Sequence, residues 1–147
     1  MKKILTTEHK TINTDIALLI ARAAIAGFML VHGLPKMENL FSDDPIAFAN
    51  VLGMGQELSL GLTVFAEVIC SLLILLGLGT RLAVIPLIIT MLVAVFYIHG
   101  ADPFVKQEMG LHYLLIYVVL LLMGSGRYSL DNFLVANARQ RYKTQRS

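Results

Sequence analysis

The chain has few of the residues on which most enzymes in water depend. Of its 147 residues, 15% are charged and one is a cysteine, whereas 56% are hydrophobic. Charged residues make up about a quarter of an ordinary globular domain, so their scarcity argues against a soluble protein. Dithiol chemistry within one chain needs two thiols, so the single cysteine excludes it.

The sequence also lacks several motifs that would indicate a particular function. The sequence has no glycine-rich phosphate loop, no dinucleotide-binding fingerprint and no nucleophile elbow. It has no HExxH motif or close histidine pair, so we expect no metal ion. A formal net charge of +2, without a basic stripe, predicts no nucleic-acid partner.

In place of such motifs, the chain has long hydrophobic runs. Four of them lie between charged residues or Gly/Pro positions, at 16–34, 58–78, 82–98 and 109–125. A helix rises about 1.5 Å per residue, so each run can cross a hydrocarbon layer of about 30 Å. The runs are apolar on all sides, unlike the alternating strands of a barrel. The sequence predicts an all-α integral membrane four-helix bundle that forms one domain over residues 1–147.

The basic residues predict the orientation of this bundle. Nine lie at the two ends or between the second and third runs: Lys2, Lys3, Lys10, Arg81, Arg127, Arg139, Arg141, Lys143 and Arg146. The other connections carry Lys36 and Lys106 only. Basic loops stay in the cytoplasm, so we expect both termini there, in a bacterial or archaeal cell (inner) membrane.

Two further helices are expected outside the spans. In the first outer loop, Asp44 can cap a short helix that begins at Pro45 and lies at the membrane interface. In the tail, 127–147, Ser129 can cap an amphipathic segment whose basic residues meet anionic lipid headgroups.

Two ionisable residues fall inside the runs, where charge is costly and usually functional. Arg22 lies in the first run and Glu67 in the second, and counting residues from opposite surfaces leaves about 7.5 Å between them along the membrane normal. An Arg22–Glu67 pair is therefore one expectation. The alternative is that Arg22 extends to the inner headgroups and Glu67 stays protonated.

A second group of polar residues lies at the outer ends of the predicted helices. His32, His99 and His112 share one depth, with Glu108 nearby. Imidazole and carboxylate groups that converge there could hydrogen-bond a quinone. Separate interfacial histidines are the alternative interpretation.

Taken in order, these landmarks resemble the DoxX family of small four-helix membrane proteins. The resemblance rests on His32-Gly33-Leu34-Pro35-Lys36, Glu67, the segment Leu75 to Arg81, Glu108, and the closing segment Gly124 to Asp131. It covers roughly residues 15–134 and implies functional roles for His32, Lys36, Glu67, Arg81, Glu108 and Arg127. The family takes its name from a membrane subunit of a thiosulfate:quinone oxidoreductase, and relatives act as chaperones or cargo receptors.

Three functions follow as hypotheses. The first is the membrane subunit of a quinone-linked oxidoreductase complex, in which His32, Lys36, His99, Glu108 and His112 surround the quinone head group and a redox partner supplies electrons. The second is a non-catalytic scaffold or assembly factor held together by Arg22 and Glu67. The third is a small-molecule carrier, which would need to form a homodimer to line a path.

Overall fold

The computed structural model describes residues 11–144, with side chains for residues 12–137. Over this range the chain is helical and contains no strand. Four helical stretches are long and apolar enough to cross a membrane, namely Ile12–Leu40, Gln56–Leu76, Thr80–Ile98 and Phe104–Met123. The prediction of an all-α protein with four membrane spans is confirmed.

Two of the spans are composite helices. The first span is α2 (Thr11–Leu40), and the second joins α3 (Gln56–Val64), the π-helical segment η2 (Phe65–Cys70) and α4 (Ser71–Leu76). The third joins α5 (Thr80–Leu92) to a second π-helical segment, η3 (Val93–Ile98), and the fourth is α6 (Phe104–Met123). A one-turn helix, η1 (Val51–Gly53), precedes α3, and α7 (Leu130–Thr144) follows α6.

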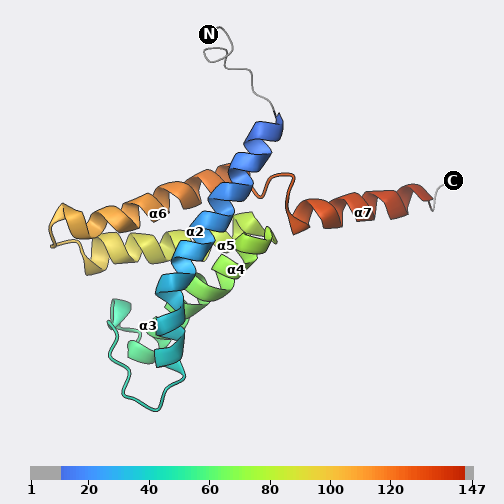
Figure 1. Cartoon of the computed structure of the whole chain (residues 1–147). Helices are drawn as coiled ribbons and strands as arrows, with labels where there is room; N and C mark the ends of the chain where they lie inside the picture. Colours follow the sequence, from blue (N-terminus) through green and yellow to red (C-terminus); the bar gives the residue numbers. More distant parts are fainter. Residues whose placement is uncertain (1–10, 145–147) are drawn as a thin grey trace, which may run out of the picture.

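The spans form two pairs that diverge toward one end (Figure 1). One pair is α2 with α3, η2 and α4; the other is α5 and η3 with α6. We call the end with the 77–79 turn and the 124–129 loop the terminal end. There the pairs lie against each other and α7 leads away (Figure 1). The other end, with the 41–55 loop and the 99–103 turn, is called the loop end.

Helix boundaries differ from the prediction at both ends of the bundle, since α2 begins at Thr11 rather than at residue 16. The first span continues through Pro35 to Leu40 instead of ending at residue 34, and the fourth begins at Phe104 rather than 109. A charged residue does not by itself end a helix, because a helix satisfies its own backbone whichever side chains it carries. As a result, Lys36 and Lys106 lie within helices.

The expected helix beginning at Pro45 is not formed. Residues 45–50 are non-helical, and the single turn η1 comes after them. Ile46 and Phe48 nevertheless pack against a buried cluster made by Leu60, Val64 and Val68. The loop therefore covers the end of α3 without a helix, because these apolar contacts replace the ones a helical face would have made.

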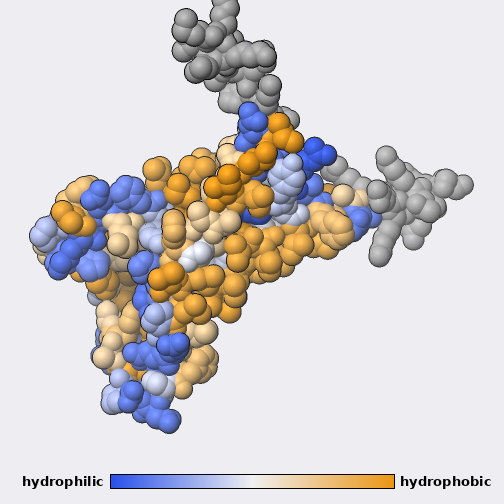
Figure 2. Space-filling view, viewed as in Figure 1, coloured by the Kyte–Doolittle hydropathy of each residue, from blue (hydrophilic) through white to orange (hydrophobic). Residues whose placement is uncertain are grey.

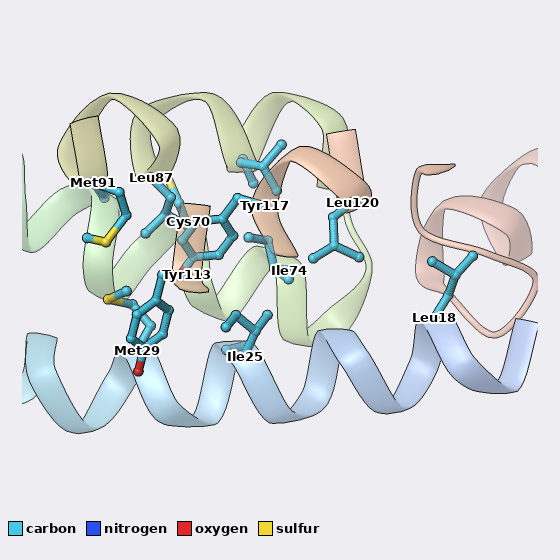
Figure 3. Close-up of a cluster of buried hydrophobic side chains, with 14 residues drawn as sticks. Leu18, Ile25, Met29, Cys70, Ile74, Leu87, Met91, Tyr113, Tyr117 and Leu120 are labelled. Atoms are coloured by element: carbon cyan, nitrogen blue, oxygen red, sulfur yellow. The ribbon is translucent and has the colours of Figure 1, made fainter. Parts of the chain in front are cut away.

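The main core lies between the two pairs. Figure 3 shows Met29 and Ile25 of α2 with Tyr113 and Tyr117 of α6 among these buried side chains, which also include Leu87 of α5. Many apolar side chains are instead exposed, including Leu82, Val31 and Val105. Figure 2 shows hydrophobic residues over the middle of the visible face and hydrophilic ones at the loop end. Such a surface is suited to lipid rather than water.

The amino-terminal lysines Lys2, Lys3 and Lys10, which supported the predicted orientation, lie outside the described residues, as does Arg146. The side chains of Arg139, Arg141 and Lys143 are likewise outside the described part, so their contact with headgroups stays a prediction. The segment does form a helix, α7, which exposes Phe133 and Leu134.

Candidate functional site

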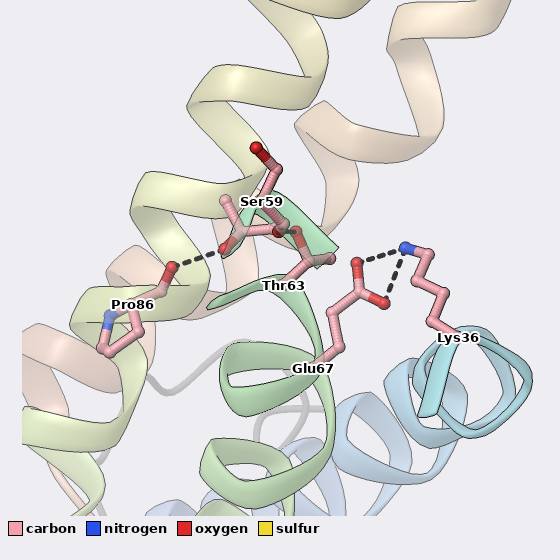
Figure 4. A network of polar contacts seen from close by, with 6 residues as sticks. Lys36, Ser59, Thr63, Glu67 and Pro86 are labelled. Carbon is pink, nitrogen blue, oxygen red and sulfur yellow. Dashed lines mark hydrogen bonds and ion pairs between the residues drawn. The ribbon is translucent and has the colours of Figure 1, made fainter. Parts of the chain in front are cut away.

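A buried ion pair joins the first two spans near the loop end. Lys36 Nζ of α2 donates hydrogen bonds to Glu67 Oε1 at 2.6 Å and Oε2 at 2.7 Å (Figure 4). The Glu67 side chain is 4% exposed and that of Lys36 33% exposed. A carboxylate so far from water needs a close cation, and the helix that continues past Pro35 supplies it.

A glycine allows the two helices to come this close. A Cβ on Gly33 would lie 2.9 Å from Glu67 Cβ and 2.9 Å from Val68 Cγ2, so no larger residue fits without movement. Gly33 and Lys36 are three residues apart and therefore share a face of α2. One face of α2 therefore carries both the glycine that lets the second span come close and the lysine that pairs with Glu67.

The expected Arg22–Glu67 pair is wrong. Lys36 is Glu67's partner, and Arg22 lies fourteen residues earlier on α2, about 21 Å away along the helix. Arg22 donates from Nη1 to the carbonyl oxygen of Ser125 at 2.9 Å and from Nη2 to that of Tyr128 at 2.8 Å. The prediction failed because it assumed that α2 ended before Lys36.

The alternative expectation for Arg22 is also only partly right. Arg22 does lie toward the terminal end, but it is 1% exposed and bonded to protein carbonyls rather than extended to headgroups. Its role is to hold the 124–129 loop against α2.

The two π-helical segments both border this region. Glu67 lies within η2, and η3 ends immediately before His99. A π-helical turn inserts an extra residue into a helix and is frequent at functional sites, because it redirects side chains. Two such segments, one on the second span and one on the third, indicate that the backbone in this region is shaped to direct particular side chains.

An open cavity of about 170 Å³ lies between the two helix pairs at this level. Its polar lining comes from α2, η2, α6 and the end of η3, and comprises His32, Lys36, Glu67, His99, Lys106 and Tyr113. Its apolar lining includes Met29, Met91 and Met109. Met29, His32 and Lys36 recur at helical spacing, so one face of α2 forms one wall.

His99 is held by the turn that follows it. Its Nδ1 lies 2.8 Å from Asp102 Oδ2, and Lys106 Nζ lies 3.5 Å from the same oxygen. Gln107 Nε2 donates to the His99 carbonyl oxygen at 2.8 Å. The hydrogen bond from His99 lowers the pKa of Asp102 below its ordinary value, with Lys106 adding to the effect. Asp102 is therefore an ionised acceptor at neutral pH.

Aromatic rings form the inner wall of the cavity. The rings of His32 and Tyr113 meet edge to face with centroids 6.0 Å apart, and Tyr113 stacks on Tyr117 at 6.1 Å. Edge-to-face and offset arrangements are the favoured ones for such rings. The contact fixes the position of His32 relative to α6.

The structure brings together His32, Lys36 and His99, as predicted, but not the whole predicted group. Glu108 and His112 are exposed and do not line the cavity. Both lie on α6, which begins earlier than predicted and presents Lys106, Met109, Gly110 and Tyr113 instead. Glu67 and Lys106 were not placed in this site, although the three- and four-residue spacing of Lys106, Gly110 and Tyr113 marks one face of α6.

The remaining motif residues hold the terminal end together. Asp131 accepts from the Gly79 N–H at 2.9 Å, and its own N–H donates to the Gly77 carbonyl oxygen at 3.0 Å. Arg81 Nη2 donates to the Leu122 carbonyl oxygen at 3.1 Å. Arg127 takes part through its backbone N–H, which donates to Asp15 Oδ1 at 3.0 Å. We call these contacts, with those of Arg22, the terminal clamp.

The cavity is suited to a small ligand with polar oxygens and an apolar ring. Among residues 11–144, no three His, Cys, Asp or Glu side chains are grouped so that they could hold a metal ion. The lining offers ammonium and imidazole N–H donors, a phenol and thioether walls. These groups can hydrogen-bond and enclose an organic head group.

Comparison with known proteins agrees with this picture. The sequence profile of the DoxX family matches residues 17–100. A protein of Haemophilus influenzae (strain ATCC 51907 / DSM 11121 / KW20 / Rd), titled "Uncharacterized protein", is 30% identical over 122 residues, which are 78% of this chain and 88% of that protein. No solved structure matches the chain. The profile match includes four of the polar residues that line the cavity, namely His32, Lys36, Glu67 and His99.

Proposed function

We propose, from the premise that this chain belongs to the DoxX family, that it is the quinone-binding membrane subunit of a redox complex. The chain is a multi-pass membrane protein with four spans. The observation that carries the proposal is the cavity between the helix pairs, where a buried ion pair and two histidines meet apolar walls. Lipid-soluble quinones combine the same features in one molecule, a polar ring and an apolar tail.

The size of the cavity supports a head group rather than a whole lipid. Pockets for drug-sized ligands occupy about 300–1,000 Å³, and this one occupies about 170 Å³. One aromatic ring therefore matches the space, while a tail would remain among the exposed apolar side chains around the cavity.

The chain's own groups can position such a ring. An ammonium group has three N–H donors, and Lys36 uses hydrogen bonds to both oxygens of Glu67, which leaves one N–H for a ligand oxygen. Tyr113 can donate to a second oxygen, and His99 can accept from that oxygen when it carries hydrogen, as it does in the reduced ring. A bound quinone would supply the exchange of two electrons and two protons, with electrons delivered by a partner protein. We place the cavity at the outer side of the cell membrane and both termini in the cytoplasm.

Extraction of bound quinone tests the proposal. The protein would be purified in mild detergent, extracted with solvent and analysed by mass spectrometry, with the quinone content given per mole of protein. We expect a quinone, counted together with its reduced quinol form, in wild type and a several-fold lower total content in His32→Gln and His99→Gln. His112→Gln is the matched control, because His112 is an exposed histidine outside the cavity.

A wild-type protein that carries no quinone, and whose melting temperature does not change when menadione is added, overturns the proposal. That result would favour the scaffold function instead. Equal loss of quinone in all three histidine variants would show binding elsewhere on the lipid-facing surface, and would also count against the cavity.

A further inference from the structure

We propose that Asp102 is a positioning residue that makes His99 a hydrogen-bond acceptor in the cavity, so that the site recognises the dihydroxy form, a quinol, in preference to the quinone. The inference rests on the proposed function for the class of ligand. It goes further by assigning the redox form that binds and a role to a residue outside the cavity.

The geometry of the turn determines which ring nitrogen of His99 carries hydrogen. An ionised carboxylate can only accept, and Asp102 Oδ2 lies 2.8 Å from Nδ1 of His99. Nδ1 of a neutral imidazole must then be the donor. The tautomer of a histidine is set by the bond that its other nitrogen makes, so Nε2 is left as an acceptor.

The turn is fixed by further bonds around His99. The His99 N–H donates to the Ala94 carbonyl oxygen at 2.9 Å, and the Asp102 N–H donates to the His99 carbonyl oxygen at 3.0 Å. Gln107 Nε2 donates to the carbonyl oxygens of both His99 and Asp102, at 2.8 and 3.3 Å. The imidazole is therefore held in place before a ligand arrives.

Asp102 acts from outside the cavity. His99 lines the cavity and Asp102 does not, so Nδ1 is occupied by the turn and Nε2 is the nitrogen available to a ligand. The other charged groups of the lining are Lys36 and Glu67, which pair with each other, and Lys106, which lies beside Asp102. With Nδ1 bonded to Asp102, the His99 ring offers Nε2 as an acceptor to a ligand hydroxyl.

The two redox forms differ in what they offer to such a site. Quinone oxygens are carbonyl groups that only accept, whereas quinol oxygens are hydroxyl groups that also donate. Lys36 can donate to either form, but an acceptor at His99 Nε2 pairs with a hydroxyl group and leaves a carbonyl unpaired. One hydrogen bond at a partly exposed group corresponds to a preference of about three- to tenfold.

The test measures the affinities of wild-type protein for menadione and for its dithionite-reduced quinol. Binding would be followed by calorimetry in detergent, under argon at pH 8.5, where imidazole is ordinarily neutral. We expect tighter binding of the quinol by about three- to tenfold. Asp102→Asn should abolish or reverse this ratio, because an amide can donate to Nδ1 and move the hydrogen to Nε2. Asp102→Glu should restore the preference, and His112→Gln should leave it unchanged.

Nitrogen-15 NMR of histidine-labelled protein gives an independent readout without ligand. The His99 signals, assigned with His99→Gln, should report hydrogen on Nδ1 in wild type and on Nε2 in Asp102→Asn. Equal affinities for the two forms in wild type, or the same ratio in Asp102→Asn, would overturn the inference and leave the proposed function standing. If neither form binds wild type, the proposed function fails and the inference fails with it.

Discussion

Removing the cation from the Lys36–Glu67 pair tests whether this contact holds the first two spans together. Lys36→Met keeps most of the length of the side chain and leaves the Glu67 carboxylate, which is 4% exposed, without its partner. Breaking a buried ion pair from one side costs about 3–5 kcal/mol. Since Lys36 is itself 33% exposed, we expect the lower end, about 3 kcal/mol of unfolding free energy.

Reversible unfolding in mixed detergent micelles, followed by far-ultraviolet circular dichroism as the denaturing detergent is raised, gives the free energy directly. The matched control is Lys106→Met. Lys106 also lines the cavity, but it is 62% exposed and 3.5 Å from Asp102. A surface pair of this kind contributes less than about 1 kcal/mol.

The double variant Lys36→Met/Glu67→Leu distinguishes the cost of leaving Glu67 without a cation from the cost of changing the two side chains. Replacing both members of a buried pair by apolar residues is often close to neutral, so the double variant should recover most of the stability lost by Lys36→Met. The reasoning is refuted if Lys36→Met is no more destabilising than Lys106→Met. It is equally refuted if the double variant is as unstable as Lys36→Met.

Three further predictions concern the packing and the turns. Gly33→Ala should lower stability by about 1–3 kcal/mol in thermal unfolding, because its Cβ would lie 2.9 Å from Glu67 Cβ; Gly27→Ala, with nothing within 4 Å, should not. Arg22→Gln removes the donor to two carbonyl groups of the 124–129 loop, so limited proteolysis should cut there several-fold faster than in Arg127→Gln, whose side chain is exposed; equal rates would contradict this. The lowered pKa of Asp102 contributes stability above the ordinary Asp value of about 3.9, and this contribution is lost as pH falls through the lower folded pKa. The melting-temperature difference between wild type and Asp102→Asn should therefore be constant above about pH 5 and shrink below pH 4; a difference independent of pH would argue against the His99–Asp102 bond.

The four spans could be predicted from the sequence because hydrophobic runs of this length have one stable form in lipid. Only a helix satisfies every backbone group within a single segment. Where each helix ends could not be predicted in the same way. The sequence pattern predicts loops at charged residues such as Lys36 and Lys106, but both lie in helices. A polar side chain at a helix end can reach water or a partner without interrupting the backbone bonds.

Part of the candidate site could be predicted, because the positions of the hydrophobic runs indicate which polar residues lie at the same membrane depth. His32, Lys36 and His99 were expected at one level, and they line one cavity. The expected Arg22–Glu67 pair depends on a first span that ends at residue 34. Because α2 continues to Leu40, Lys36 lies within the helix and reaches Glu67. The hydropathy of the sequence does not distinguish a π-helical segment from an α-helix. The directions of the Glu67 and His99 side chains could therefore not be predicted, and the structure supplies them.

The polar residues at the two ends of the bundle have different physical consequences. At the loop end, His99 retains a ring nitrogen and Lys36 an N–H beyond the bonds that position them. At the terminal end, Arg22, Arg81 and Asp131 are bonded to backbone groups of the 77–79 turn, the end of α6 and the 124–129 loop. The helix pairs meet at the terminal end and diverge toward the loop end (Figure 1), so the clamp holds together the pairs whose other ends flank the cavity. Substitutions in the clamp should therefore lower stability and ligand binding together, whereas His99→Gln should lower binding alone.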